Sequence, residues 1–66
     1  MRRNEALYTK FMTAALFHIA VVTVCQKHEE RFRAAGKEEN AQHASRSTVH
    51  FGLKAKRLLV AAARYS

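Results

Sequence analysis

Residues 11–25, FMTAALFHIAVVTVC, decide the fold of this chain. The stretch carries no formal charge, and its only polar side chains are those of Thr13, His18 and Thr23. A helix that is apolar around nearly its whole circumference is buried in protein or in lipid. The stretch is longer than the run of about 10–14 residues typical of a core helix, and shorter than the roughly 20 that cross a bilayer.

The residues upstream extend this stretch to membrane length. Residues 6–9 are compatible with lipid, Tyr8 stands where an interfacial aromatic ring stands, and Lys10 can extend its ammonium to the head groups. Counted over 6–25, the helix is about 30 Å long, which is close to the hydrocarbon thickness. No small-x-small cleavage site follows Val24. The sequence therefore predicts an uncleaved transmembrane helix over 6–25.

The composition predicts an all-α fold in one small unit, residues 1–66. The chain has no proline, only two glycines, and no Asn-Gly or Asp-Gly turn. We expect one helix from near Asn4 to Ala35, ended by Gly36 in the C′ position. Beyond the apolar part, this helix continues into a charged polar helix predicted over 26–44, in which Glu29 and Arg33 form an i, i+4 pair.

A third segment is predicted beyond a linker at 45–48. Ser47 is a good N-cap for a short basic amphipathic helix over 49–66. Residues 41–66 carry five basic side chains and no acidic one. Such a segment suits anionic head groups, nucleic acid or an acidic protein surface.

The size of the chain indicates that its stability comes partly from outside. A water-soluble domain of about 60 residues is marginal without disulfides, a metal or a partner. Cys25 is the single cysteine, so an internal disulfide is excluded. A membrane or a larger complex is the expected source of the missing stability.

Two surfaces are predicted to make contacts. On the apolar helix, small and hydroxyl residues share one stripe with a leucine. Small residues let membrane helices approach closely, so this stripe predicts contact with a partner helix. The alternative is that the threonines are simply tolerated in a membrane helix. On the tail, an apolar stripe at helical spacing predicts docking on a neighbouring protein, with a lipid surface or RNA as alternatives. The first set is Thr13, Leu16, His18, Ala20 and Thr23; the second is Phe51, Ala55, Leu58, Ala62 and Tyr65.

Basic side chains near both ends of the chain are predicted to meet lipid head groups or another anionic surface. They are Arg2, Arg3, Lys10, Lys56, Arg57 and Arg64.

The residues give little sign of catalysis or of a cofactor. His18, inside the apolar stretch, is compatible with haem ligation, proton relay or a hydrogen bond to a neighbouring helix, and we favour the hydrogen bond. His28, His43 and His50 lack metal-site spacing, and no nucleotide-binding or nucleophile motif occurs. We therefore expect no catalytic, metal or cofactor site.

These features predict a non-catalytic, single-pass accessory subunit of a large membrane complex. The architecture, with a basic start, one span and a basic tail, favours a respiratory complex or ATP synthase of the mitochondrial inner membrane. The expected partners are other subunits and anionic lipids. The alternatives are a small basic ribosomal or RNA-binding protein, a single-span regulator of a pump or channel, and a soluble helical hairpin that oligomerises.

Overall fold

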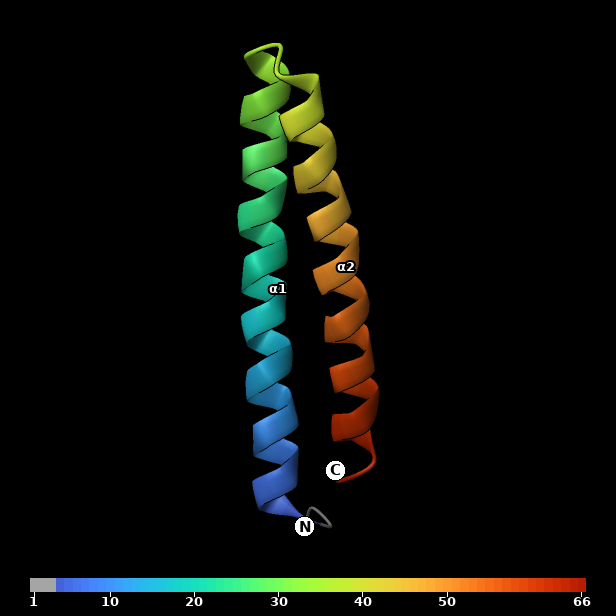
Figure 1. Ribbon diagram of the computed structural model, residues 1–66. Helices are drawn as coiled ribbons and strands as arrows, with labels where there is room; N and C mark the ends of the chain where they lie inside the picture. The colour runs from blue at the N-terminus through green and yellow to red at the C-terminus, as the bar shows by residue number, and fades with distance from the viewer. Residues whose placement is uncertain (1–3) are drawn as a thin grey trace.

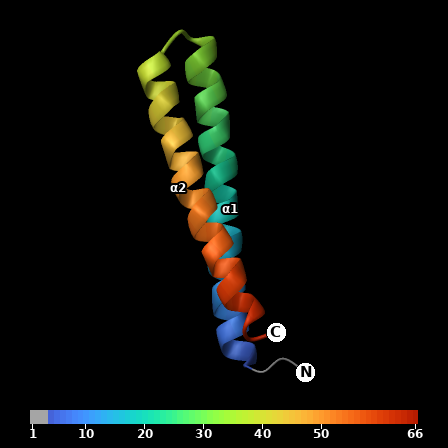
Figure 2. The same cartoon turned by 90° about the vertical axis from the view of Figure 1, so that its right-hand side faces the viewer.

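The chain folds into two antiparallel helices joined by a tight turn. The computed structural model describes residues 4–66, which form α1 (Glu5–Ala34) and α2 (Glu38–Ala63) and contain no strand. The hairpin measures 51 × 13 × 10 Å, and the start of α1 and the end of α2 lie at the end opposite the turn (Figure 1). The turned view in Figure 2 shows that α2 follows α1 along its length. The prediction of an all-α chain with one long apolar helix near its N-terminus is confirmed.

Local capping sets the limits of α1. The Asn4 side chain accepts a hydrogen bond from the backbone N–H of Leu7 at 3.1 Å, as an N-cap residue does. At the other end Gly36 has a φ of +74°, and the backbone N–H of Lys37 donates to Phe32 O at 2.8 Å. With the Gly36 N–H donating to Arg33 O at 3.1 Å, this is a Schellman motif. The prediction of Gly36 as the C′ residue is confirmed.

One arginine ties the two helices together across the turn. Both Nε and Nη2 of Arg33 donate to Glu29 Oε2, at 3.1 and 2.9 Å, so the predicted i, i+4 pair is present. Its Nη1 donates to Glu38 Oε1 at 2.6 Å, in the first turn of α2. Hydrogen bonding to Glu29 and the charge of Glu38 raise the pKa of Arg33 above its ordinary value, so the guanidinium stays charged.

The two helices meet along stripes that repeat every three and four residues. This spacing keeps one side of each helix against its neighbour, as in an antiparallel coiled coil. Every member of both stripes is buried or half-buried. On α1 the stripe is Tyr8, Phe11, Ala15, His18, Val22, Cys25, Glu29 and Phe32; on α2 it is Ala41, Ala44, Thr48, Phe51, Ala55, Leu58 and Ala62, continued just past the helix end by Tyr65.

The core between the helices is thin. Among the described residues, the buried apolar ones are four alanines, Ala15, Ala41, Ala55 and Ala62, and no large side chain is fully buried. Hydrophobic stabilisation grows with the apolar area removed from water, at about 25 cal/mol per Å². Alanine side chains offer little such area, and the larger side chains of both stripes are only half-buried, so the hydrophobic stabilisation of the hairpin is small.

The predicted linker at 45–48 is wrong. Residues 38–63 form one continuous helix, so the charged segment predicted over 26–44 is split by the turn at 35–37, and the segment predicted over 49–66 is not a separate helix. Ser47 is therefore not an N-cap; that position belongs to Lys37. The polar residues continue the helix, and Thr48 lies in the stripe that faces α1. Its hydroxyl donates to Ala44 O, one turn earlier in the same helix, at 3.0 Å.

Candidate membrane-contact and docking surfaces

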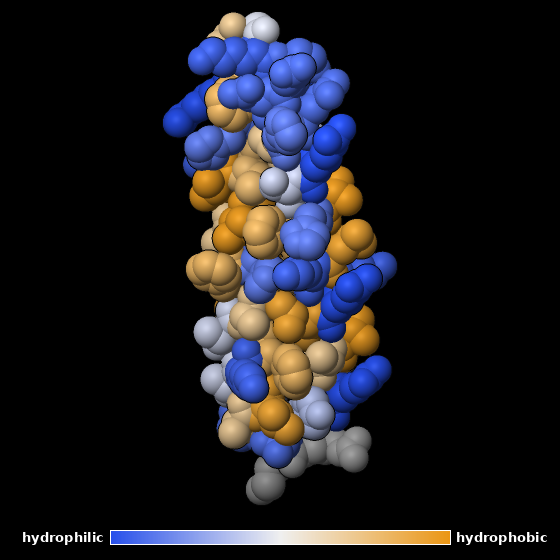
Figure 3. All heavy atoms as spheres, viewed as in Figure 1, coloured by the Kyte–Doolittle hydropathy of each residue, from blue (hydrophilic) through white to orange (hydrophobic). Residues whose placement is uncertain are grey.

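The outward side of α1 is apolar and uncovered. Leu16 is 59% exposed, Phe17 65% and Val24 53%, although each lies in the charge-free stretch. Thr13, Ala20 and Thr23 are also exposed on this side. In Figure 3 polar side chains gather at the turn end, whereas apolar ones follow both helices below it. We call the set Thr13, Leu16, Phe17, Ala20, Thr23 and Val24 the α1 outer face.

This helix is long and apolar enough to cross a membrane. It has 30 residues, and Ala15 is the one among them that is buried inside the hairpin. Packing against α2 therefore covers one side of the apolar stretch, largely by half-burial, and leaves the opposite side exposed. An exposed apolar surface of this kind marks contact with a membrane or with another protein.

His18 does not belong to the α1 outer face. Its Nδ1 donates to the backbone carbonyl of Ala14 at 2.7 Å, and its ring centroid lies 5.7 Å from that of Phe51 on α2. A carbonyl oxygen only accepts, so the proton sits on Nδ1. The other four predicted partner-contact residues are exposed, whereas His18 lies at the contact between the two helices. The Thr23 hydroxyl donates to its own helix, to Ile19 O at 3.3 Å.

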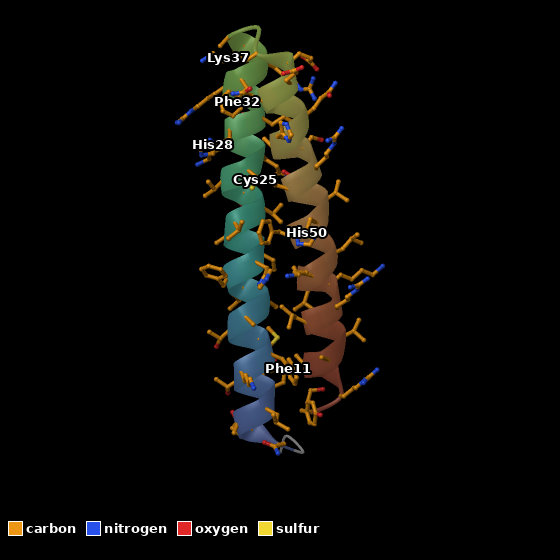
Figure 4. All side chains as sticks on the ribbon, viewed as in Figure 1. Phe11, Cys25, His28, Phe32, Lys37 and His50 are labelled. Atoms are coloured by element: carbon orange, nitrogen blue, oxygen red, sulfur yellow. The ribbon has the colours of Figure 1, made fainter. Side chains whose placement is uncertain are left out.

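The predicted docking stripe of the tail packs against α1. Ala55 and Ala62 are buried, and Phe51 and Leu58 are half-buried. The Tyr65 ring stacks on Phe11 at a centroid distance of 5.8 Å and an interplanar angle of 9°. Figure 4 shows Phe11 between the helices near their open end. Docking of this stripe on another molecule stays a prediction, and it requires α1 to be exchanged for that molecule.

The outward side of α2 combines apolar and basic side chains. Val49, Leu53 and Val60 are 60%, 53% and 53% exposed. Lys56, Arg57 and Arg64 line a shallow groove beside Leu53 and Val60. The predicted anionic-surface residues of the tail are thus brought together on one face. This apolar set was not among the docking residues predicted from the sequence, although a spacing of four and seven residues is typical of one face of a helix.

Two of the basic side chains of α2 lie beside the middle of the apolar stretch. A second groove is lined by Ala14 and His18 from α1 and by Lys54, Arg57 and Leu58 from α2. Residues 14–18 are the centre of the predicted span over 6–25. A lysine or arginine at the centre of a membrane costs about 2.5–3.5 kcal/mol on insertion scales. The closed hairpin therefore cannot enter a bilayer as a unit without burying these cations.

The remaining histidines are distributed over both helices. His28 packs on Phe32 with ring centroids 6.1 Å apart, and it lines a groove near the turn together with Cys25 and His43. Figure 4 shows His28 and Cys25 on α1 and His50 on α2. In residues 4–66 no three His, Cys, Asp or Glu side chains are placed to hold a metal ion.

Two of the predicted head-group residues, Arg2 and Arg3, lie outside the described residues. Lys10 is exposed on α1. No protein family, no curated protein and no solved structure matches this chain.

Proposed function

We propose that this chain is a non-catalytic, single-pass structural subunit of a larger membrane assembly. One observation carries the proposal: the hairpin leaves the apolar side of α1 uncovered, with Leu16, Phe17 and Val24 all more than half exposed. Leaving such a surface in water is unfavourable, at about 25 cal/mol for each Å² of apolar area. Lipid and neighbouring transmembrane helices cover such a surface without cost.

Within the assembly, α1 braces its neighbours through Thr13, Ala20 and Thr23. Small side chains let a neighbouring backbone approach closely, and Leu16 between them fills the space beside a small residue of the partner. The Thr23 hydroxyl is already bonded to its own backbone, so it needs no partner in lipid. The proposed hosts are the respiratory complexes or ATP synthase of the mitochondrial inner membrane, which collect many small single-span subunits.

A soluble, self-assembling helical hairpin is the second candidate. The observation that favours it is the position of Lys54 and Arg57 beside Ala14 and His18, which keeps the closed hairpin out of the bilayer. RNA binding has less support, because the rings of Phe51 and Tyr65 that stacking on bases requires are engaged with α1.

Carbonate extraction of native membranes followed by native gel electrophoresis tests the proposal. We expect the chain to stay in the carbonate pellet and then to migrate within a large complex after detergent extraction. The co-migrating subunits then identify the host complex and show whether the chain is a permanent subunit or a regulator. Release by carbonate, with recovery of a self-associated species, supports the soluble hairpin instead, and recovery in ribosomal fractions supports RNA binding.

A further inference from the structure

We infer that the closed hairpin opens on an anionic bilayer: α1 enters the membrane, and α2 exchanges α1 for the lipid surface. This inference rests on the proposed membrane function. The conflict that drives it is geometric, because Lys54 and Arg57 lie beside Ala14 and His18, at the centre of the apolar stretch. Insertion of α1 therefore requires α2 to leave it.

The contact between the helices is weak enough to be exchanged. Its fully buried side chains are four alanines, and every aromatic ring in it is only half-buried. The outer ends of the helices are held by the Phe11–Tyr65 stack, whereas Arg33 and Gly36 hold the turn. Opening from the free ends thus breaks two ring contacts, Phe11–Tyr65 and His18–Phe51, and a row of small contacts, and it leaves the turn intact.

The new partner of α2 is a lipid surface, because α2 has an apolar stripe beside a set of basic side chains. The stripe released from α1 contains Phe51, Leu58 and Tyr65, which are the type of side chains that enter the interfacial region. Lys54, Lys56 and Arg57 are exposed beside that stripe. Residues 41–66 carry a charge of +5 with no acidic side chain, so anionic head groups attract this helix and zwitterionic ones do not.

The turn is placed to separate the two environments. The acidic side chains of residues 27–40 balance the basic ones, and polar groups cover the turn end in Figure 3. This end stays in water while the apolar part of α1 crosses the bilayer. Differential affinity of α2 for α1 and for anionic lipid then sets the balance between closed and open states.

A crosslinked hairpin tests the inference. In a full-length Cys25→Ala background, Phe11→Cys and Tyr65→Cys place two thiols at the open end, where a short bismaleimide joins the helices. The matched control is the same protein with both thiols alkylated. Insertion is measured as carbonate-resistant recovery with vesicles of phosphatidylcholine, with and without phosphatidylglycerol.

We expect the alkylated control to insert into the anionic vesicles and the crosslinked protein to insert at least about tenfold less, because its cations are held beside the span. A second crosslinked variant carrying Lys54→Leu, Lys56→Leu and Arg57→Leu should regain insertion, since leucine is favourable at that depth. Equal insertion of the crosslinked protein and its control overturns the inference and leaves the membrane function standing. Failure of the uncrosslinked wild-type protein to insert into either vesicle overturns the membrane function itself.

Discussion

The two helices have inner faces with the same spacing and outer faces of different chemical character. Each inner stripe repeats at three- and four-residue steps, and the larger side chains of the α1 stripe face the mostly small ones of the α2 stripe, so each helix fits the other. Outside, α1 exposes Leu16, Phe17 and Val24, whereas α2 sets Leu53 and Val60 among Lys56, Arg57 and Arg64. The difference teaches that the inner faces specify the hairpin, while the outer faces specify where each helix can go.

The largest expected effect comes from placing a charge on the α1 outer face. Leu16→Arg should abolish membrane integration, because arginine at the centre of a span costs about 2.5–3.5 kcal/mol where leucine is favourable. Carbonate-resistant recovery measures the effect. The matched control is Leu53→Arg on α2, since Leu53 is 53% exposed and Leu16 is 59%. Unchanged recovery of the Leu16→Arg protein counts against the span.

A charge on the inner face of α2 should disturb the hairpin instead. Leu58 is half-buried beside Ala14 and His18, so Leu58→Glu should destabilise the closed state by about 2–3 kcal/mol and loosen association with the complex. Thermal unfolding followed by circular dichroism, together with co-purification, measures both effects.

Val60→Glu is the matched control, because Val60 is 53% exposed on the outer face of the same helix. It should leave the melting temperature within a few degrees of the wild-type value. If Leu58→Glu melts and co-purifies like the wild-type protein, the inner stripe is not what holds α2.

The two glycines should respond to alanine in opposite directions. An added Cβ meets nothing within 4 Å at either position, so space does not decide the result. Gly36→Ala forces a side chain into a left-handed conformation at φ +74° and should cost about 1–2 kcal/mol. Gly52→Ala lies inside α2 and should stabilise the hairpin by about 0.5–1 kcal/mol. Melting temperatures that shift in the same direction would contradict the observed turn.

The helix starts give the smallest expected contrast. Asn4→Ala removes the N-cap bond to Leu7 and should cost about 1 kcal/mol of helix stability. At the start of α2, Lys37 makes no side-chain cap bond, so Lys37→Asn should stabilise that helix by about 0.5–1 kcal/mol. Amide hydrogen exchange of the first turn of each helix measures the change. Slower exchange at α1 in the Asn4→Ala protein would disprove the cap.

Local patterns predicted the start and end of α1. Asn4 and Gly36 act through neighbours within a few residues, which makes their roles visible in a one-dimensional pattern. The same local reasoning failed at 45–48, where a cluster of small polar residues was taken for a linker. Those residues are helical in the packed pair, where Thr48 lies in the stripe that faces α1, and a one-dimensional pattern does not show that packing.

The sequence by itself determined the all-α fold, the apolar helix and the basic tail, because composition and periodicity act along the chain. Only the tertiary structure decided that the tail stripe lies against α1, since an apolar stripe does not encode which surface covers it. It also decided that Lys54 and Arg57 lie beside the centre of the apolar stretch. That juxtaposition depends on the turn at Gly36, which makes residues far apart in the chain level with one another in space.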